Sequence, residues 1–309
     1  MGWETWIVTM FSRMLAYGTP LLLATLGEIY AERSGVLNLG VEGMMIIGAY
    51  TGFSVALVTG NPWVGILAAA VVGGAFSLIH AFASITLRAN QVVSGLALTM
   101  LGLGLSGVLG RGWEGRPLAV PLGKITVPGL SQIPILGPIL FEGQNLLVYI
   151  SILLVPLMWY VLYRTRIGIS IRSVGEDPAT ADSLGVNVAL VRYACVFVGG
   201  ILAGVAGGYL SVGYRPAWTE GMTAGTGWVV IALTIFAFWN PVLGLAGAYF
   251  FAILFHLSFR LQEQLPPELL KAMPYAFAII VLVIVSRGTL RKRMGAPAAL
   301  TLPYTRGEE

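Results

Sequence analysis

Two long stretches of this chain contain no Asp, Glu, Lys or Arg, and they restrict the folds that it can adopt. They are Gly43–Leu87 and Gly221–Phe259. A bilayer core about 30 Å thick is crossed by about 20 helical residues, so each stretch is long enough for two crossings. Charged residues make up only 10% of the chain and apolar residues 57%, which leaves too little charge to cover a soluble domain of 309 residues. The sequence predicts an all-α, polytopic membrane protein.

Gly, Pro, Asn and charged residues divide the apolar sequence into about nine predicted crossings. They lie near residues 7–27, 40–60, 63–87, 91–110, 146–163, 189–214, 225–239, 241–262 and 269–286. Asn61-Pro62 and Asn240-Pro241 are interpreted as tight turns between spans, because proline has no amide hydrogen and clashes with the preceding helical turn. Residues 1–309 would then form a single transmembrane domain.

The basic residues favour one orientation of the bundle, because Lys and Arg gather on the cytoplasmic side of membrane proteins. Placing the polar segment 164–192 and the tail 287–309 in the cytoplasm, together with the connections that hold Arg33 and Arg88, puts 11 of the 18 basic residues there. The C-terminus would be cytoplasmic and the N-terminus outside, although Arg13 would suit an N-inside chain with one more crossing. The net charge of +4 is explained by this placement, so it does not indicate binding to nucleic acid. The expected partner of the apolar surface is membrane lipid. The predicted location is the plasma or inner membrane of a bacterium or archaeon.

Two short motifs recur at nearly the same spacing and indicate an internal repeat. Asn61-Pro62 and the apolar residues after it resemble Asn240-Pro241 and its successors at an offset of 179. Glu42-Gly43-Met44 recurs as Glu220-Gly221-Met222 at an offset of 178. The offset spans five predicted crossings, an odd number, so the two copies would lie in opposite orientations. Inverted repeats are typical of transporters, which handle solute near the interface between the copies.

The polar segment 164–192 lies between long apolar runs, and such a concentration of charge suits contact with a soluble partner. Within it, Asp177-Pro178 predicts a helix N-cap followed by proline at the first helical position, and Gly185 predicts the stop. The result is a helix of about two turns, Pro178–Leu184. A helix this short is not stable alone and must pack against something. The alternative is a solvated connector.

Five polar residues near the ends of predicted spans are candidates for a translocation pathway: Asn38, Glu42, Asn90, Gln91 and Ser94. The glycine-rich stretch around the first two predicts irregular backbone, which survives at membrane depth only where protein or a water-filled cavity satisfies its polar groups. Alternatively, Asn38 caps the second span and Glu42 snorkels to the interface. The last three residues could hydrogen-bond a neutral polar solute inside the bundle, or only cap the fourth span.

The other polar residues within the spans give no catalytic or metal-binding pattern. His80 and His256 are expected to make interhelical hydrogen bonds rather than to bind metal, and Arg192 is interpreted as a snorkelling anchor. The sequence contains no Gly-x-x-x-x-Gly-Lys-Ser/Thr phosphate-binding loop, so the chain is not expected to hydrolyse ATP or to need a cofactor. An ion-coupled secondary transporter would need a carboxylate or histidine deep in the bundle, and only Glu42 and the two histidines are candidates.

Three motifs resemble the permease subunits of ABC importers, in the superfamily that carries branched-chain amino acids, ribose-type sugars and nucleosides. They are Ser34-Gly35-Val36-Leu37-Asn38-Leu39-Gly40-Val41-Glu42-Gly43-Met44-Met45, Ala89-Asn90-Gln91-Val92-Val93-Ser94-Gly95 and the stretch Val174–Val186. The first motif is most similar to the nucleoside (guanosine-type) branch. The length of the chain suits the shorter of two paired permeases.

The resemblance implies a type II ABC importer permease with inverted five-helix halves, in which nine crossings would mean that one N-terminal helix is absent. It implies that 164–192 is the cytoplasmic coupling loop, whose docking residues would be Glu176, Asp177, Pro178, Ala179, Ala181 and Gly185. The implied partners are a cytoplasmic ATP-binding subunit, a second paralogous permease and an extracytoplasmic solute-binding protein. A nucleoside is the expected cargo, with a simple sugar or a branched-chain amino acid as the alternative. Thr180-Ala181-Asp182 departs from the usual Glu-Ala-Ala of this loop.

Overall fold

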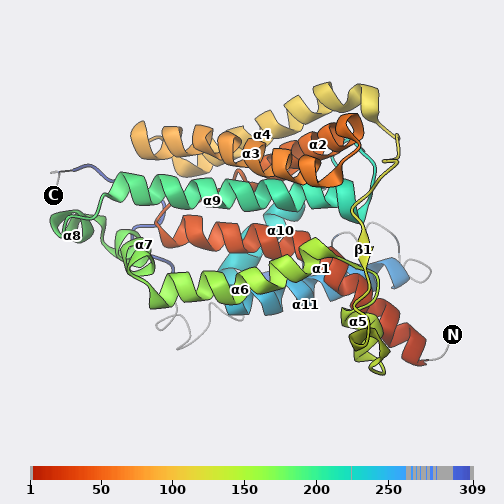
Figure 1. Ribbon diagram of the computed structural model, residues 1–309. Helices are drawn as coiled ribbons and strands as arrows, with labels where there is room; N and C mark the ends of the chain where they lie inside the picture. The colour runs from red at the N-terminus through yellow and green to blue at the C-terminus, as the bar shows by residue number, and fades with distance from the viewer. Residues whose placement is uncertain are drawn as a thin grey trace.

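The structure is a computed structural model that describes residues 3–223, 225–261 and 295–306, with single positions between 266 and 283. Within this part, seven helical spans are long and apolar enough to cross a membrane. Their helices are α1 (Trp3–Arg33), α2 (Val41–Thr59), α3 (Pro62–Ala81), α4 (Gln91–Gly110), α6 (Leu146–Arg164), α9 (Val188–Tyr209) and α11 (Pro241–Arg260). Figure 1 shows long helices lying side by side along one direction. The all-α membrane fold is confirmed.

Shorter elements connect or extend these helices. They are α5 (Leu136–Leu140), α7 (Arg166–Glu176), α8 (Pro178–Ser183), α10 (Thr226–Phe236) and the antiparallel strands β1 (Lys124–Ile125) and β2 (Gln144–Asn145). Two π-helical turns, Phe82–Thr86 and Leu210–Tyr214, lengthen α3 and α9, and two 3-10 turns lie at Arg111–Trp113 and Leu130–Gln132.

Two of the predicted crossings differ from the structure, and a third cannot be compared. The crossing predicted at 225–239 is wrong in length, because α10 has 11 residues and rises only about 16 Å, half of a bilayer core. The first span, predicted to end at residue 27, continues as helix to Arg33. The crossing predicted at 269–286 lies, apart from single positions, outside the described residues.

The two Asn-Pro turns begin helices in the same way. Asn61 accepts a hydrogen bond from the Trp63 amide at 3.0 Å, and Asn240 accepts one from the Val242 amide at 2.9 Å. In each case proline occupies the first helical turn, where its missing N–H costs no hydrogen bond. The predicted tight turns are therefore present, and each asparagine caps the helix that follows it.

The helices after these turns run in opposite directions, as expected of inverted copies. The end of α1 is bonded to the residues just before α11, and farther along Tyr17 of α1 stacks on Phe255 of α11, so these helices are antiparallel. The helix α9 is also antiparallel to α1, since Arg192 at its start meets Ser34 just beyond the end of α1. The helix α3 runs against α9, as the contacts below show, and is therefore parallel to α1.

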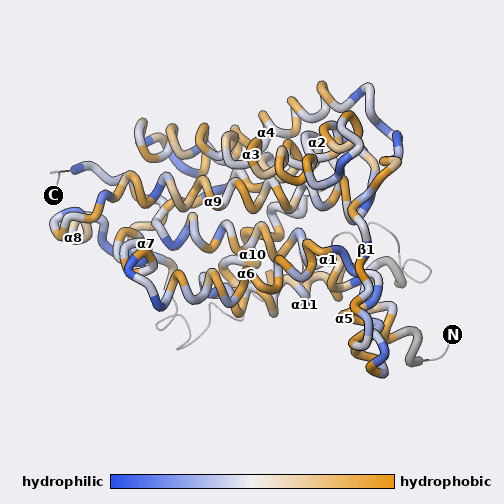
Figure 2. Tube along the Cα trace, viewed as in Figure 1, coloured by the Kyte–Doolittle hydropathy of each residue, from blue (hydrophilic) through white to orange (hydrophobic). Residues whose placement is uncertain are grey.

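Small residues allow the central helices to approach closely. A Cβ atom on Gly204 of α9 would lie 2.2 Å from the Ala69 carbonyl oxygen and 2.9 Å from the Gly73 Cα of α3. On the same helix, a Cβ on Gly200 would lie 2.4 Å from the Ser77 side chain. Such contacts replace the hydrophobic effect, which is weak between helices surrounded by lipid tails. Figure 2 shows apolar residues along the lengths of the helices and hydrophilic residues gathered toward their ends.

The bundle has two distinct polar ends. At the end that holds the N-terminus, the loop after α4 pairs with the loop after α9: the Leu118 amide donates to Pro216 O at 2.9 Å and the Gly115 amide to Trp218 O at 3.1 Å. The opposite end holds α7, α8 and the C-terminal segment (Figure 1). These two loops thus lie together, at the end of the bundle away from the polar segment 164–192.

Candidate functional site

The polar segment 164–192 contains two helices rather than one. The first, α7, begins at Thr165, whose side chain accepts a hydrogen bond from the Gly168 amide at 3.2 Å. A Cβ on Gly168 would lie 2.2 Å from the Leu162 carbonyl oxygen, so only glycine permits so sharp a turn out of α6. Ile171 and Val174 are buried on the inner face of α7. Their helical spacing from Ile167 was a signal in the sequence that could have predicted α7.

The second helix, α8, has the predicted cap and the predicted stop. The Asp177 carboxylate accepts hydrogen bonds from the Thr180 hydroxyl at 2.5 Å and the Thr180 amide at 3.0 Å. These two bonds favour the charged carboxylate and lower the pKa of Asp177 below its ordinary value. Pro178 occupies the first helical position and Gly185 is left-handed at φ +85°. The helix itself ends at Ser183, one residue before the predicted end.

The side chains of α8 divide into a buried and an exposed set. Ala181 is buried beneath the helix, whereas Ala179 and Glu176 are exposed and the Leu184 side chain is 78% exposed. The Glu176 carboxylate accepts one hydrogen bond from the Ala298 amide at 3.3 Å. The helix therefore offers a small, partly apolar knob at one end of the bundle.

Irregular backbone between α1 and α2 is held by side chains from three helices. The Leu37 amide donates to Gln91 Oε1 at 2.8 Å, and the Asn38 amide donates to Glu28 Oε1 at 3.2 Å. The His80 ring lies 3.0 Å from both the Leu37 carbonyl oxygen and the Ser94 hydroxyl. The protein itself thus satisfies the polar groups of this segment, and the expected interhelical bonding of His80 is confirmed.

Two of the pathway candidates have local roles. The Asn38 side chain is buried and accepts a hydrogen bond from the Gly40 amide at 3.1 Å. It does not cap α2, whose N-cap is Gly40 without a side-chain cap, so that interpretation is wrong. Asn90 is exposed and caps α4 by accepting from the Val93 amide at 3.1 Å. The structure therefore brings Asn38, Gln91 and Ser94 to one segment and leaves Asn90 at the helix start.

Glu42 is buried, and the prediction that it snorkels to the interface is wrong. Its side chain is 3% exposed. The carboxylate accepts hydrogen bonds from the Thr223 hydroxyl at 2.5 Å, the Gly225 amide at 3.1 Å and the Gly227 amide at 2.6 Å. These amides form the N-terminus of α10, whose own N-cap offers no side chain. Glu42 therefore caps α10 from the start of α2, and its negative charge complements the dipole of that helix.

Arg192 is likewise buried, contrary to its interpretation as a snorkelling anchor. Its side chain is 2% exposed, and the guanidinium donates to the Ser34 carbonyl at 3.2 Å and the Leu302 carbonyl at 3.3 Å. A cation taken out of water needs such partners. Arg192 thus joins the start of α9 to the α1–α2 segment and to the C-terminal segment.

Sequence reasoning missed a polar cluster at the end of α1. Glu28 and Glu32 are buried there, and Glu32 accepts a hydrogen bond from the Trp239 indole N–H at 2.5 Å. Arg33 donates to the Phe238 and Trp239 carbonyls at 3.1 and 3.3 Å. These two acceptor residues have φ of +50° and +53°, a left-handed conformation that side chains disfavour. The i, i+4 spacing of the two glutamates on an otherwise apolar helix was the available signal.

Across the described residues, no three His, Cys, Asp or Glu side chains gather into a metal site. The polar groups described above instead form three sets: hydrogen bonds around the starts of α2 and α10, the cluster at the end of α1, and the exposed α8 with its surroundings. The first set holds the short helix α10 at its start, and the third can be contacted from outside the bundle.

Comparison with known proteins identifies similar chains. The sequence profile of the family described as the permease component of branched-chain amino acid transport systems matches residues 10–285. A candidate glucose ABC transporter permease, TsgC13 of Haloferax volcanii, is 40% identical, covering 93% of this chain and 94% of its own. The guanosine ABC transporter permease NupQ of Bacillus subtilis is 37% identical over 95% of both chains. The nucleoside ABC transporter permease NupC of Lactococcus lactis is 36% identical over 88% of this chain and 90% of its own.

Proposed function

Since this chain belongs to the family of branched-chain amino acid transport permease components, we propose that it is the permease subunit of an ATP-driven importer of nucleosides. Its membrane-embedded helices and its relatives make it a permease component of an ABC transporter. The observation that carries the nucleoside assignment is the similarity, over most of the chain, to two permeases named for guanosine and nucleosides. The TsgC13 relative favours a simple sugar as the second candidate.

The cap on α10 supports a neutral cargo over an amino acid. In transporters, the positive N-terminal ends of half-helices point at anionic groups of the substrate. Here the Glu42 carboxylate already accepts the Gly225 and Gly227 amides at that end. An amino acid carboxylate would find these donors occupied and would meet a like charge. A nucleoside or a sugar carries no such charge.

The proposed mechanism assigns the energy source to partner subunits. A cytoplasmic ATPase would hold α8, and its closure on ATP would move α8 and α7 against the end of α1. A solute-binding protein would deliver solute to the paired loops at the opposite end, and a second, paralogous permease would complete the pathway. The close approach of α7 to α1 supports this route, since a Cβ on Gly175 would lie 2.0 Å from the Arg33 carbonyl oxygen.

The cargo is tested by uptake of labelled solutes in a strain that lacks the chromosomal copy of this permease. Cells carrying the gene on a plasmid should accumulate guanosine and adenosine, and excess unlabelled nucleoside should compete with this uptake. Ribose, glucose and leucine should enter at the rate of cells with an empty plasmid. Restored glucose uptake without nucleoside uptake would replace the nucleoside assignment by the sugar one.

The coupling role is tested by reversing charge at α8. The double variant Glu176→Lys, Asp177→Lys should lose uptake and lose co-purification of the ATPase subunit, because it removes the α8 cap and the negative charge at this end. Glu142→Lys is the matched control and should retain the ATPase, because Glu142 is exposed and lies between α5 and β2. Full retention of the ATPase by the α8 variant would contradict the coupling role.

A further inference from the structure

We propose that the C-terminal segment 295–306 is a structural part of the ATPase-docking surface, which holds α8 in place and forms one wall of a hollow beside it. This inference rests on the proposed coupling role of α8. It assigns the partner surface to two segments that lie far apart in sequence. The ATPase would contact a composite of α8 and the C-terminal segment rather than α8 alone.

Hydrogen bonds join the segment to both ends of the coupling region. The Ala299 amide donates to the Gly175 carbonyl at 2.9 Å, and the Ala298 amide donates to the Glu176 carboxylate at 3.3 Å. The Leu302 carbonyl accepts from the buried Arg192 guanidinium at 3.3 Å. The segment is thereby bonded to the end of α7 and to the start of α9, which are the two attachments of α8 to the bundle.

Apolar packing adds to these bonds beneath α8. Val174, Ala181 and Val188 are buried in one cluster, and Tyr304 of the C-terminal segment packs against it. Ala181 is the buried side chain of α8, so the ring of Tyr304 lies on the side of the helix that faces the bundle. A helix of six residues makes too few internal hydrogen bonds to be stable alone. Its position must come from this cluster.

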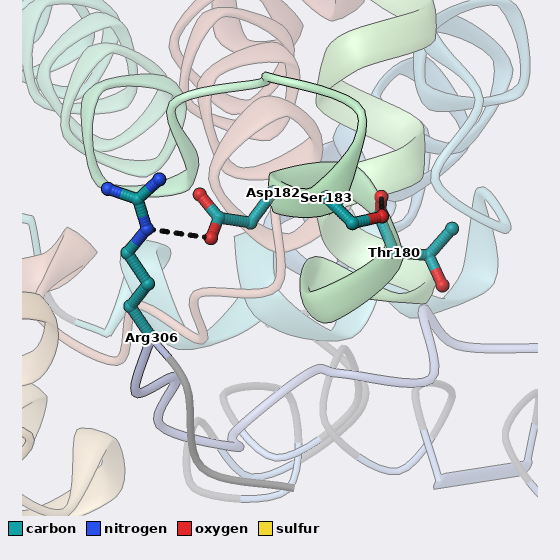
Figure 3. A network of polar contacts seen from close by, with 4 residues as sticks. All are labelled: Thr180, Asp182, Ser183 and Arg306. Atoms are coloured by element: carbon teal, nitrogen blue, oxygen red, sulfur yellow. Dashed lines mark hydrogen bonds and ion pairs between the residues drawn. The ribbon is translucent and has the colours of Figure 1, made fainter.

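One ion pair lies on the surface of the same contact. Arg306 Nε lies 3.0 Å from Asp182 Oδ2, and Figure 3 shows the arginine reaching the aspartate from the C-terminal segment. The Arg306 side chain is 83% exposed, and an exposed pair adds little stability because water and salt screen it. The packing of the half-buried Tyr304 against the apolar cluster and the hydrogen bonds of the backbone therefore hold the segment more firmly than the ion pair does.

The segment also completes a hollow next to α8. The hollow has a volume of about 560 Å³ and is lined by Thr86, Arg88, Asp182, Asn187, Tyr304 and Arg306, among others. Two of its walls come from the turn after α3 and the start of α9. The other walls come from Asp182 of α8 with the residues that follow it, and from the C-terminal segment, so removing that segment opens the hollow on one side. A surface with a knob and an adjoining recess is suited to receive a folded partner.

The test compares ATPase co-purification across matched variants of the complete transporter. A chain stopped after residue 294 and the variant Tyr304→Ala should each lower the amount of bound ATPase about tenfold, the effect of losing one strong contact. Glu142→Lys is the control, because Glu142 is exposed and follows α5, which lies at the opposite end of the bundle (Figure 1).

Two further measurements separate this inference from the coupling role itself. Every variant should elute as a monodisperse transporter, and the amides of residues 178–186 should exchange faster in the truncated chain and in Tyr304→Ala. If the truncated chain keeps full ATPase binding while Glu176→Lys, Asp177→Lys loses it, the C-terminal segment has no such role and the coupling role stands. If neither variant loses the ATPase, both proposals fail.

Discussion

At the scale of single residues, Glu42 is the group on which the position of α10 depends most. Its carboxylate accepts three hydrogen bonds from the residues that begin α10, and it lies at the start of α2. The repeated motif places Glu220 at the corresponding position of the second half, where it is exposed. The two copies have therefore diverged: one glutamate holds the half-helix and the other faces outward.

Glu42→Ala should destabilise the protein by about 4 kcal/mol or more, because it removes three hydrogen bonds to a carboxylate, each contributing about 1.5–3 kcal/mol, and leaves buried donors unpaired. Glu42→Gln should cost less, since one acceptor oxygen remains. The measurement is the free energy of unfolding in detergent micelles. Glu220→Ala is the control and should stay within about 0.5 kcal/mol of the wild type. Equal losses at both positions would contradict the capping role.

At the scale of elements, the turn between α10 and α11 has a strained backbone, and hydrogen bonds from Arg33 of α1 hold it in place. Arg33→Gln should release it, because Phe238 and Trp239 are left-handed and their carbonyls accept from the Arg33 guanidinium. Amides of residues 238–240 should exchange about tenfold faster, the effect of losing one such contact. Adding Phe238→Gly should recover part of the loss, since glycine adopts positive φ without strain. An unchanged exchange rate in Arg33→Gln would show that other contacts hold the turn.

The same scale shows what sequence could and could not predict. Asn61-Pro62, Asn240-Pro241 and Asp177-Pro178 gave the starts of three helices, because capping is a local interaction between neighbouring residues. The end of α10 could not be predicted, since the left-handed turn at Phe238 and Trp239 is bonded to Arg33, a residue far away in the chain. The end of α1 was misplaced because Glu28 and Glu32 resemble a polar boundary, whereas the fold buries them against Asn38 and Trp239.

At the scale of the whole molecule, the two polar ends of the bundle predict its orientation in the membrane. The loop after α4 should lie outside the cell and α8 in the cytoplasm. Cys195 is buried and is the only cysteine of the sequence, so Cys195→Ser provides a background without thiols. In that background Gln132→Cys, in the loop after α4, should react with a membrane-impermeant maleimide in intact cells. Ser183→Cys, in α8, should react only after permeabilisation. Both residues are exposed, so the reverse pattern would place α8 outside and exclude its coupling role.

The helical spans were the part most accessible to sequence, because the length of an apolar run reflects the thickness of the membrane directly. The antiparallel directions of α3 and α11 agree with the repeat found in the motifs. The contacts of residues 295–306 were not predictable, because they depend on backbone groups and on single side chains such as Tyr304, which no local pattern distinguishes.

The contact between the C-terminal segment and α8 also affects how the protein is made. Glu176 and Ala298 are separated by 122 positions, so at about 5–20 residues per second the two sides leave the ribosome about 6–24 s apart. During that interval α8 has left the ribosome but lacks its support. On our proposal, a nascent or prematurely released chain cannot bind the ATPase firmly. Firm binding of the ATPase is thus confined to chains translated past residue 306.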